Sequence, residues 1–265
     1  GHMYVTAILL FRGFVIPFAI RLYVKDELCD GIGVQFNKTT EFAAQIISEF
    51  DAPKGLNTIV LFDCFYLCKP VIKSCKMKCF KWVSPLKSNR NIFKNGRKLK
   101  AGSYAHNLFN RGEKKTLSIN ENENSTFYRF VDAGMMKVSK LGDVRIIASR
   151  KNKNQNVLAL ATDIQDEKAS EIIKIYTLRW TIEVFFKESK QQLGLGQYQN
   201  RSYRAAVTHL HLVCYSYALL THMQIMHCEK EQKKYYCVVN DSKKSIGSLK
   251  IELNTVLWDD SIDYL

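Results

Sequence analysis

A short apolar run that stops at a carboxylate constrains the fold of this chain more than any other feature. Residues 59–62 read Ile-Val-Leu-Phe, and Asp63 follows them directly. A continuously apolar strand is typical of a sheet that is covered on both faces. Open α/β sheets place their ligand-binding residues where strands end, so Asp63 is a candidate for chemistry.

The amino-terminal stretch predicts a hairpin. Residues 3–11 and 14–24 are rich in β-branched and aromatic residues on either side of Arg12 and Gly13, and Pro17 fits an edge or a bulge. The same stretch is a poor membrane span, because Arg12, Gly13 and Pro17 interrupt its middle. The pattern therefore indicates two antiparallel strands.

The rest of the chain alternates between helix and strand patterns, which indicates an α/β class. Apolar residues at three-to-four spacing predict a helix over 40–50 that crosses back over the sheet. Further along, the patterns predict a helix over 66–78, strands over 80–83, 146–148 and 157–162, and long helices over 166–192 and 203–227.

A change in composition after Pro85 suggests how the chain is organised. Residues 86–144 are rich in Lys, Asn, Ser and Gly, which favours an inserted, β-rich, basic subdomain. The main domain would then consist of 1–85 and 145–228, and 229–265 would be a mixed carboxy-terminal tail.

The chain is strongly basic, and one segment carries most of the excess. Lys and Arg total 39 against 25 Asp and Glu, a formal net charge of +14. Thirteen of the basic residues lie between Lys73 and Lys115, where Glu113 is the single acid. Such a patch favours contact with nucleic-acid phosphates, the alternative being a solvated Lys-rich loop. Four aromatic residues within it are candidates for stacking on bases: Trp82, Phe93, Tyr104 and Phe109.

The helix predicted over 166–192 gathers polar residues on one face. At about 100° per residue, the following five fall within about 80° of one another: Tyr176, Arg179, Glu183, Lys187 and Lys190. One carboxylate flanked by cations and a phenol suits a metal ion beside bound phosphates. The alternative is that Arg179, Glu183 and Lys187 are ordinary surface ion pairs at i,i+4 spacing.

Four of these residues also match a known signature. Tyr176, Arg179, Glu183 and Lys190 are separated by two, three and six residues, which resembles the Y-REK signature of bacterial insertion-sequence transposases of the DDE class. The context Y-T-L-R-W-T-I-E-V-F-F-K-E-S-K-Q-Q-L-G-L, the following Q-Y-Q-N-R-S-Y-R and the V-L-F-D-C-F-Y around Asp63 are similar to that family as well. The resemblance covers most of residues 1–228.

The resemblance implies a fold and a chemistry. It implies an α/β, RNase H-like fold of the retroviral-integrase superfamily, a mixed sheet flanked by helices, with a β-rich insertion between the second and third catalytic acids. Three carboxylates would bind two divalent metal ions for DNA cleavage and strand transfer. Asp63 matches the second acid and Glu183 the third. Oxygen ligands suit Mg²⁺, with Mn²⁺ as a substitute.

The resemblance also implies a DNA-contacting set. Tyr176, Arg179 and Lys190 match positions that contact phosphates near the transposon end, and Lys187 and Arg201 join them by charge and proximity. The partners would be transposon ends and target DNA, without a membrane. Homodimers on paired ends and a cytoplasmic, nucleoid-associated location in a bacterium would follow from the family.

The first acid of the family has no match in the sequence. Asp26 and Asp30 are expected in the loop after the hairpin, Asp51 is expected at the end of a helix, and none ends the first strand of the sheet. The expectation is therefore a chain truncated at its amino terminus, with the first acid upstream of Gly1. A catalytically inert DNA-binding fragment of a truncated or decayed transposase is the alternative function.

The cysteines and histidines admit simpler interpretations. Eight Cys in a long Lys-rich chain indicate reduced thiols, although Cys64, Cys68, Cys75 and Cys79 leave open a structural zinc and, with it, a basic nucleic-acid-binding module. Other polar residues are expected to be structural: His209 and His211 in or beside a core, and Asp163 and Asp166 as helix caps.

Overall fold

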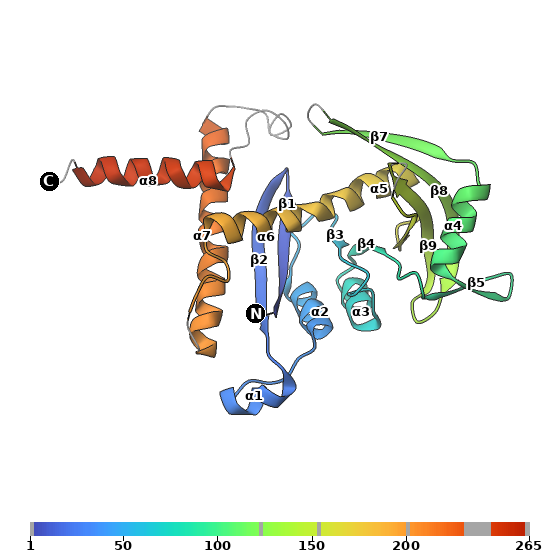
Figure 1. Cartoon of the computed structure of the whole chain (residues 1–265), viewed down its shortest axis with the longest axis horizontal. Helices are drawn as coiled ribbons and strands as arrows, with labels where there is room; N and C mark the ends of the chain where they lie inside the picture. Colours follow the sequence, from blue (N-terminus) through green and yellow to red (C-terminus); the bar gives the residue numbers. More distant parts are fainter. Residues whose placement is uncertain (1–2, 122–123, 153–154, 200–201, 231–244, 263–265) are drawn as a thin grey trace. The chain divides into compact units, whose positions relative to one another are not determined.

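A computed structural model describes the whole chain except residues 1–2, 122–123, 153–154, 200–201, 231–244 and 263–265. The chain divides into two compact units (Figure 1). One unit combines Gly1–Thr39 with Trp180–Leu265, and the other is the intervening Thr40–Arg179. We call them the terminal unit and the central unit.

The central unit is built on an eight-stranded mixed sheet. β3 (Ile59–Leu61) and β4 (Lys81–Pro85) pair in parallel, and the other pairings in the described sheet are antiparallel. The order is β3-β4-β10-β9-β8-β5-β6, with β7 paired to β8 off this path. The remaining strands are β5 Asn91–Lys94, β6 Arg97–Lys100, β7 Lys115–Glu121, β8 Asn124–Val138, β9 Gly142–Lys151 and β10 Leu158–Thr162.

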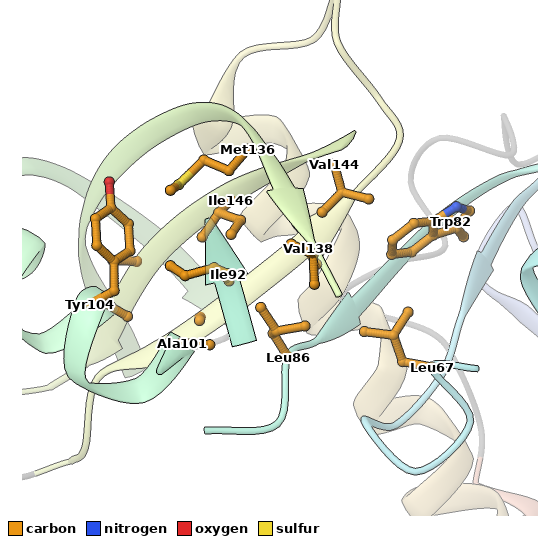
Figure 2. Packing of buried hydrophobic residues seen from close by; sticks show 14 of the residues in the cluster. Leu67, Trp82, Leu86, Ile92, Ala101, Tyr104, Met136, Val138, Val144 and Ile146 are labelled. Carbon is orange, nitrogen blue, oxygen red and sulfur yellow. The ribbon is translucent and has the colours of Figure 1, made fainter. Parts of the chain in front are cut away.

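Three helices close a core on one face of this sheet. They are α2 (Thr39–Glu49), α3 (Lys69–Met77) and α4 (Ala101–Arg111). Figure 2 shows part of this core, in which side chains of α4 meet those of the strands: Ala101 and Tyr104 lie with Ile92, Met136, Val138 and Ile146.

A separate core lies on the opposite face, beneath α5 (Ala169–Thr177). Ile172 and Ile173 of this helix are buried against strand residues that include Ile147 and Leu160. Ile146 and Ile147 belong to different cores because successive strand residues point to opposite faces of a sheet. The expected large mixed sheet flanked by helices is thus confirmed.

The strands of residues 86–144 continue the main sheet. β4 pairs with β10, β10 with β9, and β9 with β8, so the hydrogen-bonded ladder runs without a break into the basic segment. α4 is a helix that the sequence analysis missed in this segment. Its sequence does contain apolar residues at helical spacing, and Ala101, Ala105 and Phe109 among them are buried. The pattern was overlooked because Lys, Asn and Gly residues flank it.

The terminal unit contains the predicted hairpin. β1 (Met3–Phe11) and β2 (Phe14–Tyr23) form a two-stranded antiparallel sheet. Arg12 and Gly13 both have positive φ, 50° and 81°, as a tight hairpin turn requires. The register shifts between Ala7 and Ile8, beside the pairing of Ile8 with Pro17, which fits the edge or bulge expected for Pro17.

Long helices pack on this hairpin. They are α6 (Thr181–Gln192) and α7 (Tyr203–Lys230), and α8 (Ile246–Ile262) packs against the same core. The Thr221 hydroxyl of α7 donates to the Val15 carbonyl of β2 at 3.0 Å. The core side chains include Val15, Ile20, Leu22, Phe185, Leu210, Val213, Tyr217 and Leu220. No helix in the described part of the chain is long and apolar enough to cross a bilayer.

One expectation for the terminal unit is wrong, and its tail contains a helix that the sequence analysis did not predict. Asp26 and Asp30 lie on a short helix, α1 (Asp26–Ile32), rather than in a loop. The carboxy-terminal tail contains α8, whose apolar residues Ile246 and Leu249 are buried against the α6 and α7 core. Both elements depend on tertiary contacts that local periodicity does not report.

Candidate active site

Asp63 lies two residues beyond β3. Phe62 stacks on Trp82 with ring centroids 6.1 Å apart, and its N–H donates to the Val83 carbonyl at 3.4 Å. The Asp63 carbonyl then accepts from the Tyr66 N–H at 2.9 Å, which turns the chain away from the strand. The Asp63 side chain is 58% exposed, so its carboxylate is accessible to a ligand.

The strand that leads to Asp63 is covered on both faces, as its sequence predicts. Val60 packs against the core that α2, α3 and α4 close, and Ile59 and Leu61 pack against the core beneath α5. All three remain half-buried because β3 is the last strand in the sheet order and pairs only with β4 among the described strands.

Two residues of the predicted signature reach Asp63 within the central unit. Nη1 of Arg179 lies 3.8 Å from Oδ2 of Asp63, and its guanidinium carbon lies 5.9 Å from the centre of the Tyr176 ring. At 3.8 Å the ion pair is Coulombic rather than a hydrogen bond. The structure therefore places Arg179 beside both Asp63 and Tyr176.

The tyrosines beside Asp63 are held in their neutral form. Burial raises the pKa of Tyr176, the positive charge of Arg179 opposes this, and the charge of Asp63 adds to it. Burial also raises the pKa of Tyr66, with a further contribution from Asp63. A neutral phenol keeps its proton, so both residues are available as hydrogen-bond donors to an anion.

The helix that carries the signature is not continuous, contrary to the prediction. α5 begins at Ala169 rather than Asp166, and a 3-10 turn at Leu178–Trp180 separates it from α6. The Thr177 hydroxyl donates to the Lys174 carbonyl at 2.6 Å, a local bond that competes with helical pairing. The division between the two units falls in this turn.

The break divides the signature residues between the two units. A 3-10 turn advances about 120° per residue instead of 100°, so the estimate of a single face, which assumed one continuous α-helix, does not extend across the turn. Tyr176 and Arg179 form one group in the central unit. Glu183, Lys187 and Lys190 form another on α6, where their spacing still places them together.

On α6, the predicted third acid lies at the rim of a hollow. Glu183 is half-buried in the first turn, where a carboxylate is favoured by the helix dipole. Lys187 and Lys190 are exposed. The hollow lies within the terminal unit and is lined by Trp180, Glu183, Val184, Lys187, Glu188, Gln191, Gln192, Ser245 and Gly247.

Buried contacts fix the orientation of α6. Phe185 is fully buried, with its ring centre 4.9 Å from that of Tyr217 on α7. The Tyr217 hydroxyl donates to Oε2 of Glu188 at 2.7 Å. Burial, followed by this hydrogen bond and the charge of Glu188, raises the pKa of Tyr217. These contacts determine which side of α6 presents Glu183.

The remaining site predictions have mixed outcomes. Arg201 lies outside the described residues. No group of three His, Cys, Asp or Glu that could hold a metal ion occurs among the residues that the structure describes. Asp63 belongs to the central unit and Glu183 to the terminal unit. The two predicted metal ligands therefore lie in different units, and the surroundings of each are given separately.

Three of the four aromatic residues proposed to stack on bases are buried in the core of the basic segment, so the stacking prediction is wrong for them. Trp82, Tyr104 and Phe109 are buried in the core beneath α4, because each occupies the inward position of its strand or helix. Phe93 alone remains 36% exposed. Charged and hydrophobic residues alternate in this segment because successive side chains of its strands point to opposite faces of the sheet, one of which is buried in the core.

The cysteine cluster does not form a zinc site. Cys64, Cys68, Cys75 and Cys79 are all described, yet they are not grouped as metal ligands. Burial raises the pKa of Cys75 to about 12, which keeps its thiol protonated.

The helix-cap prediction for Asp163 is also wrong. Its carboxylate accepts from the Trp82 N–H at 2.9 Å and so fastens β4 to the end of β10. The residue at the start of α5 is Lys168, which makes no side-chain capping bond. Burial, its largest influence, raises the pKa of Asp163.

Comparison with known proteins adds the family. A family model described as the transposase DDE domain matches residues 37–219, more than half of the chain. The chain belongs to this family. It is a catalytic domain whose activity is DNA transposition, so DNA is its substrate, and DDE transposases generally depend on divalent metal ions. No curated protein matches the chain.

The structure adds one exposed aromatic residue that the sequence analysis of this transposase domain overlooked. Trp180 is 61% exposed and lines the hollow beside Glu183. Its signal was a large apolar residue directly after Arg179, outside the apolar stripe of the helix. It was missed because the stretch was treated as one continuous helix.

Proposed function

We propose that this domain belongs to a bacterial insertion-sequence transposase of the Y-REK type, which cleaves transposon DNA at its ends and joins the freed 3′-hydroxyl to target DNA. The observation that carries the proposal is the meeting of Asp63, Tyr176 and Arg179. Asp63 and Arg179 are 116 residues apart in the sequence, so their contact is a product of the fold.

Asp63 and Glu183 are the residues proposed to hold Mg²⁺, for which Mn²⁺ would substitute. Both supply carboxylate oxygens, the ligands that hard divalent ions prefer. Asp63 is exposed, and Glu183 lines an open hollow, so each is accessible. When bound, such ions activate the attacking water or 3′-hydroxyl and stabilise the leaving oxygen.

The other proposed site residues bind and orient the DNA backbone. The guanidinium of Arg179 and the neutral phenol of Tyr176 present donors beside Asp63, which suits a phosphate next to the scissile bond. Lys187 and Lys190 extend this role along α6, and Arg201 follows by charge alone. Correct placement of the phosphate contributes to the rate through orientation.

The finer fold assignment is part of the same proposal. The parallel pair β3 and β4 fits an RNase H-like core, and the strands of residues 86–144 fit its β-rich insertion. Residues 1–85 and 145–228 would form the catalytic domain, with 229–265 as a tail.

An inert DNA-binding fragment is the second candidate. The observation that favours it is that Asp26 and Asp30 lie on α1 and Asp51 follows α2, so none of these acids ends a strand as the family's first acid would. The transposase candidate also carries the proposals of a homodimer on paired ends and of a nucleoid-associated location. Light scattering in the presence of transposon-end DNA tests the dimer.

Nicking of a labelled DNA duplex tests the function. The chain is compared with its Asp63→Asn variant, with and without Mg²⁺. Cleavage that needs both the metal and Asp63 supports the transposase. Salt-sensitive binding without cleavage supports the inert fragment, and absence of both would refute the DNA-directed proposal.

A further inference from the structure

One face of the sheet in the central unit combines an exposed aromatic ring with cations on both neighbouring strands. We call it the Phe93 face and define it by Phe93, Lys98, Lys100 and Lys137. Phe93 lies on β5, Lys98 and Lys100 on β6, and Lys137 on β8.

The strand register places these side chains on the same side. Phe93 is directly opposite Lys98 on β6 and directly opposite Lys137 on β8. Residues directly opposite each other in a sheet point to the same face. Neighbouring strands are about 4.8 Å apart, so one lysine lies on each side of the ring, with about 10 Å between the backbones that carry them.

Burial of the alternate residues shows which face this is. Ile92 and Val138, each next to a Phe93-face residue in sequence, are 0% and 1% exposed in the core beneath α4 (Figure 2). Phe93, Lys98 and Lys137 therefore point to the opposite side, where Phe93 is 36% exposed and both lysines are exposed. The core beneath α5 lies farther along that side and takes in Phe130 of β8 together with residues of β4, β9 and β10, but neither Phe93 nor Lys137.

The cations of this face are not neutralised by ion pairs. Within the described residues, Lys98, Lys100 and Lys137 form none, although the Lys100 ammonium donates to the Asn89 carbonyl at 3.1 Å. The nearest acid by register is Asp143, opposite Lys137 on β9. The face thus keeps a net positive charge around an exposed ring.

We propose that the Phe93 face binds single-stranded DNA, with an unpaired base stacked on Phe93 and the flanking phosphates near Lys98 and Lys137. This inference rests on the proposed DNA-directed function and adds a second contact outside the Asp63 site. Charge complementarity selects a polyanion, and the exposed aromatic face selects bases that are not already stacked. In a duplex the ring faces of the bases are occupied by their neighbours.

Fluorescence anisotropy with labelled oligo(dT) tests the proposal on the full chain, with a duplex of equal length as the second probe. Phe93→Ala is expected to weaken oligo(dT) binding about fivefold to hundredfold, the loss measured for one stacked base elsewhere. Its affinity for the duplex should change by less than about twofold. Phe93→Trp should restore oligo(dT) binding and show quenched emission when the oligonucleotide is added.

A matched control separates stacking from a general effect on the sheet. Phe127→Ala removes another exposed aromatic ring, 52% exposed on β8 of the same sheet, and should leave both affinities unchanged. Lys98→Gln and Lys137→Gln should each reduce the salt dependence of oligo(dT) binding.

Other outcomes would overturn the proposal. Equal losses for Phe93→Ala and Phe127→Ala, or equal losses of Phe93→Ala on oligo(dT) and duplex, would remove Phe93 as a stacking residue. Preference for an RNA oligonucleotide over oligo(dT) would refute the DNA assignment. Because binding needs no cleavage, a chain that fails to nick yet shows the Phe93 effect would refute the proposed catalysis and leave this inference standing.

Discussion

The hydrogen bond between Tyr217 and Glu188 is expected to hold the Glu183-bearing helix in place. Tyr217 is 3% exposed, and its hydroxyl lies 2.7 Å from a carboxylate oxygen, which is a charge-assisted distance. Such a bond contributes about 1.5–3 kcal/mol. Tyr217→Phe removes it and retains the ring packing against Phe185, so local opening of α6 should become easier by that amount.

Native-state hydrogen exchange measures this effect directly. The amides of α6 should exchange about 10- to 150-fold faster in Tyr217→Phe, which is the same free energy expressed as a ratio. Tyr215→Phe is the matched control, because Tyr215 is on the same helix and is 63% exposed. Equal exchange in the two variants would refute the reasoning.

The pH dependence of this bond has a definite sign. The pKa of Tyr217 is raised in the folded chain above its ordinary value of 10.0, so the folded state holds the phenol proton more tightly. The stabilisation is fully present below pH 10 and is lost as the pH rises through the folded-state pKa. Alkaline destabilisation should therefore be smaller in Tyr217→Phe, as denaturant titrations at pH 9 and pH 11 would show. An unchanged difference between the two pH values would contradict the assignment.

Three further outcomes follow from the site and the thiols. Arg179→Ala should flatten the salt dependence of DNA binding by about one unit of log–log slope. The free energy of unfolding should fall by less than about 1 kcal/mol, because the ion pair of Arg179 with Asp63 is partly exposed. An unchanged slope would show that Arg179 does not contact DNA. Glu183→Gln, or chelation of divalent ions, should abolish nicking and preserve binding, and loss of binding would count against a metal-ligand role. Iodoacetamide at pH 8 should label the exposed Cys79 and spare Cys75, whose pKa is raised to about 12 by burial, as peptide mass spectrometry would reveal.

Local patterns predicted much of the fold. The turn at Arg12 and Gly13 defined the hairpin, because two successive positive φ angles are a local property. The apolar run before Asp63 predicted a covered strand, and the long helix after Tyr203 followed from its periodicity. These elements are strongly periodic, which is where sequence reasoning is most dependable.

Other elements depended on the context around them. The Ala101–Arg111 helix was not predicted because basic residues flank its apolar pattern. The 3-10 turn at Leu178–Trp180 was not predicted because it contains no Gly or Pro. Asp163 had the position of a helix cap but bonds to β4, which is distant in the sequence. The burial of the Ala101–Arg111 helix and the bond of Asp163 depend on contacts between separate segments, whereas the 3-10 turn follows a local bond of Thr177.

The sequence by itself determined the chemistry of the candidate site, because the residue types and gaps of Tyr176, Arg179, Glu183 and Lys190 are local facts. Only the tertiary structure decided that Arg179 meets Asp63 and that Phe93 is exposed while Phe109 is buried. The physical reason is that the direction of a side chain depends on which strand or helix packs beside it. Partners so far apart in the chain leave no local trace in its sequence.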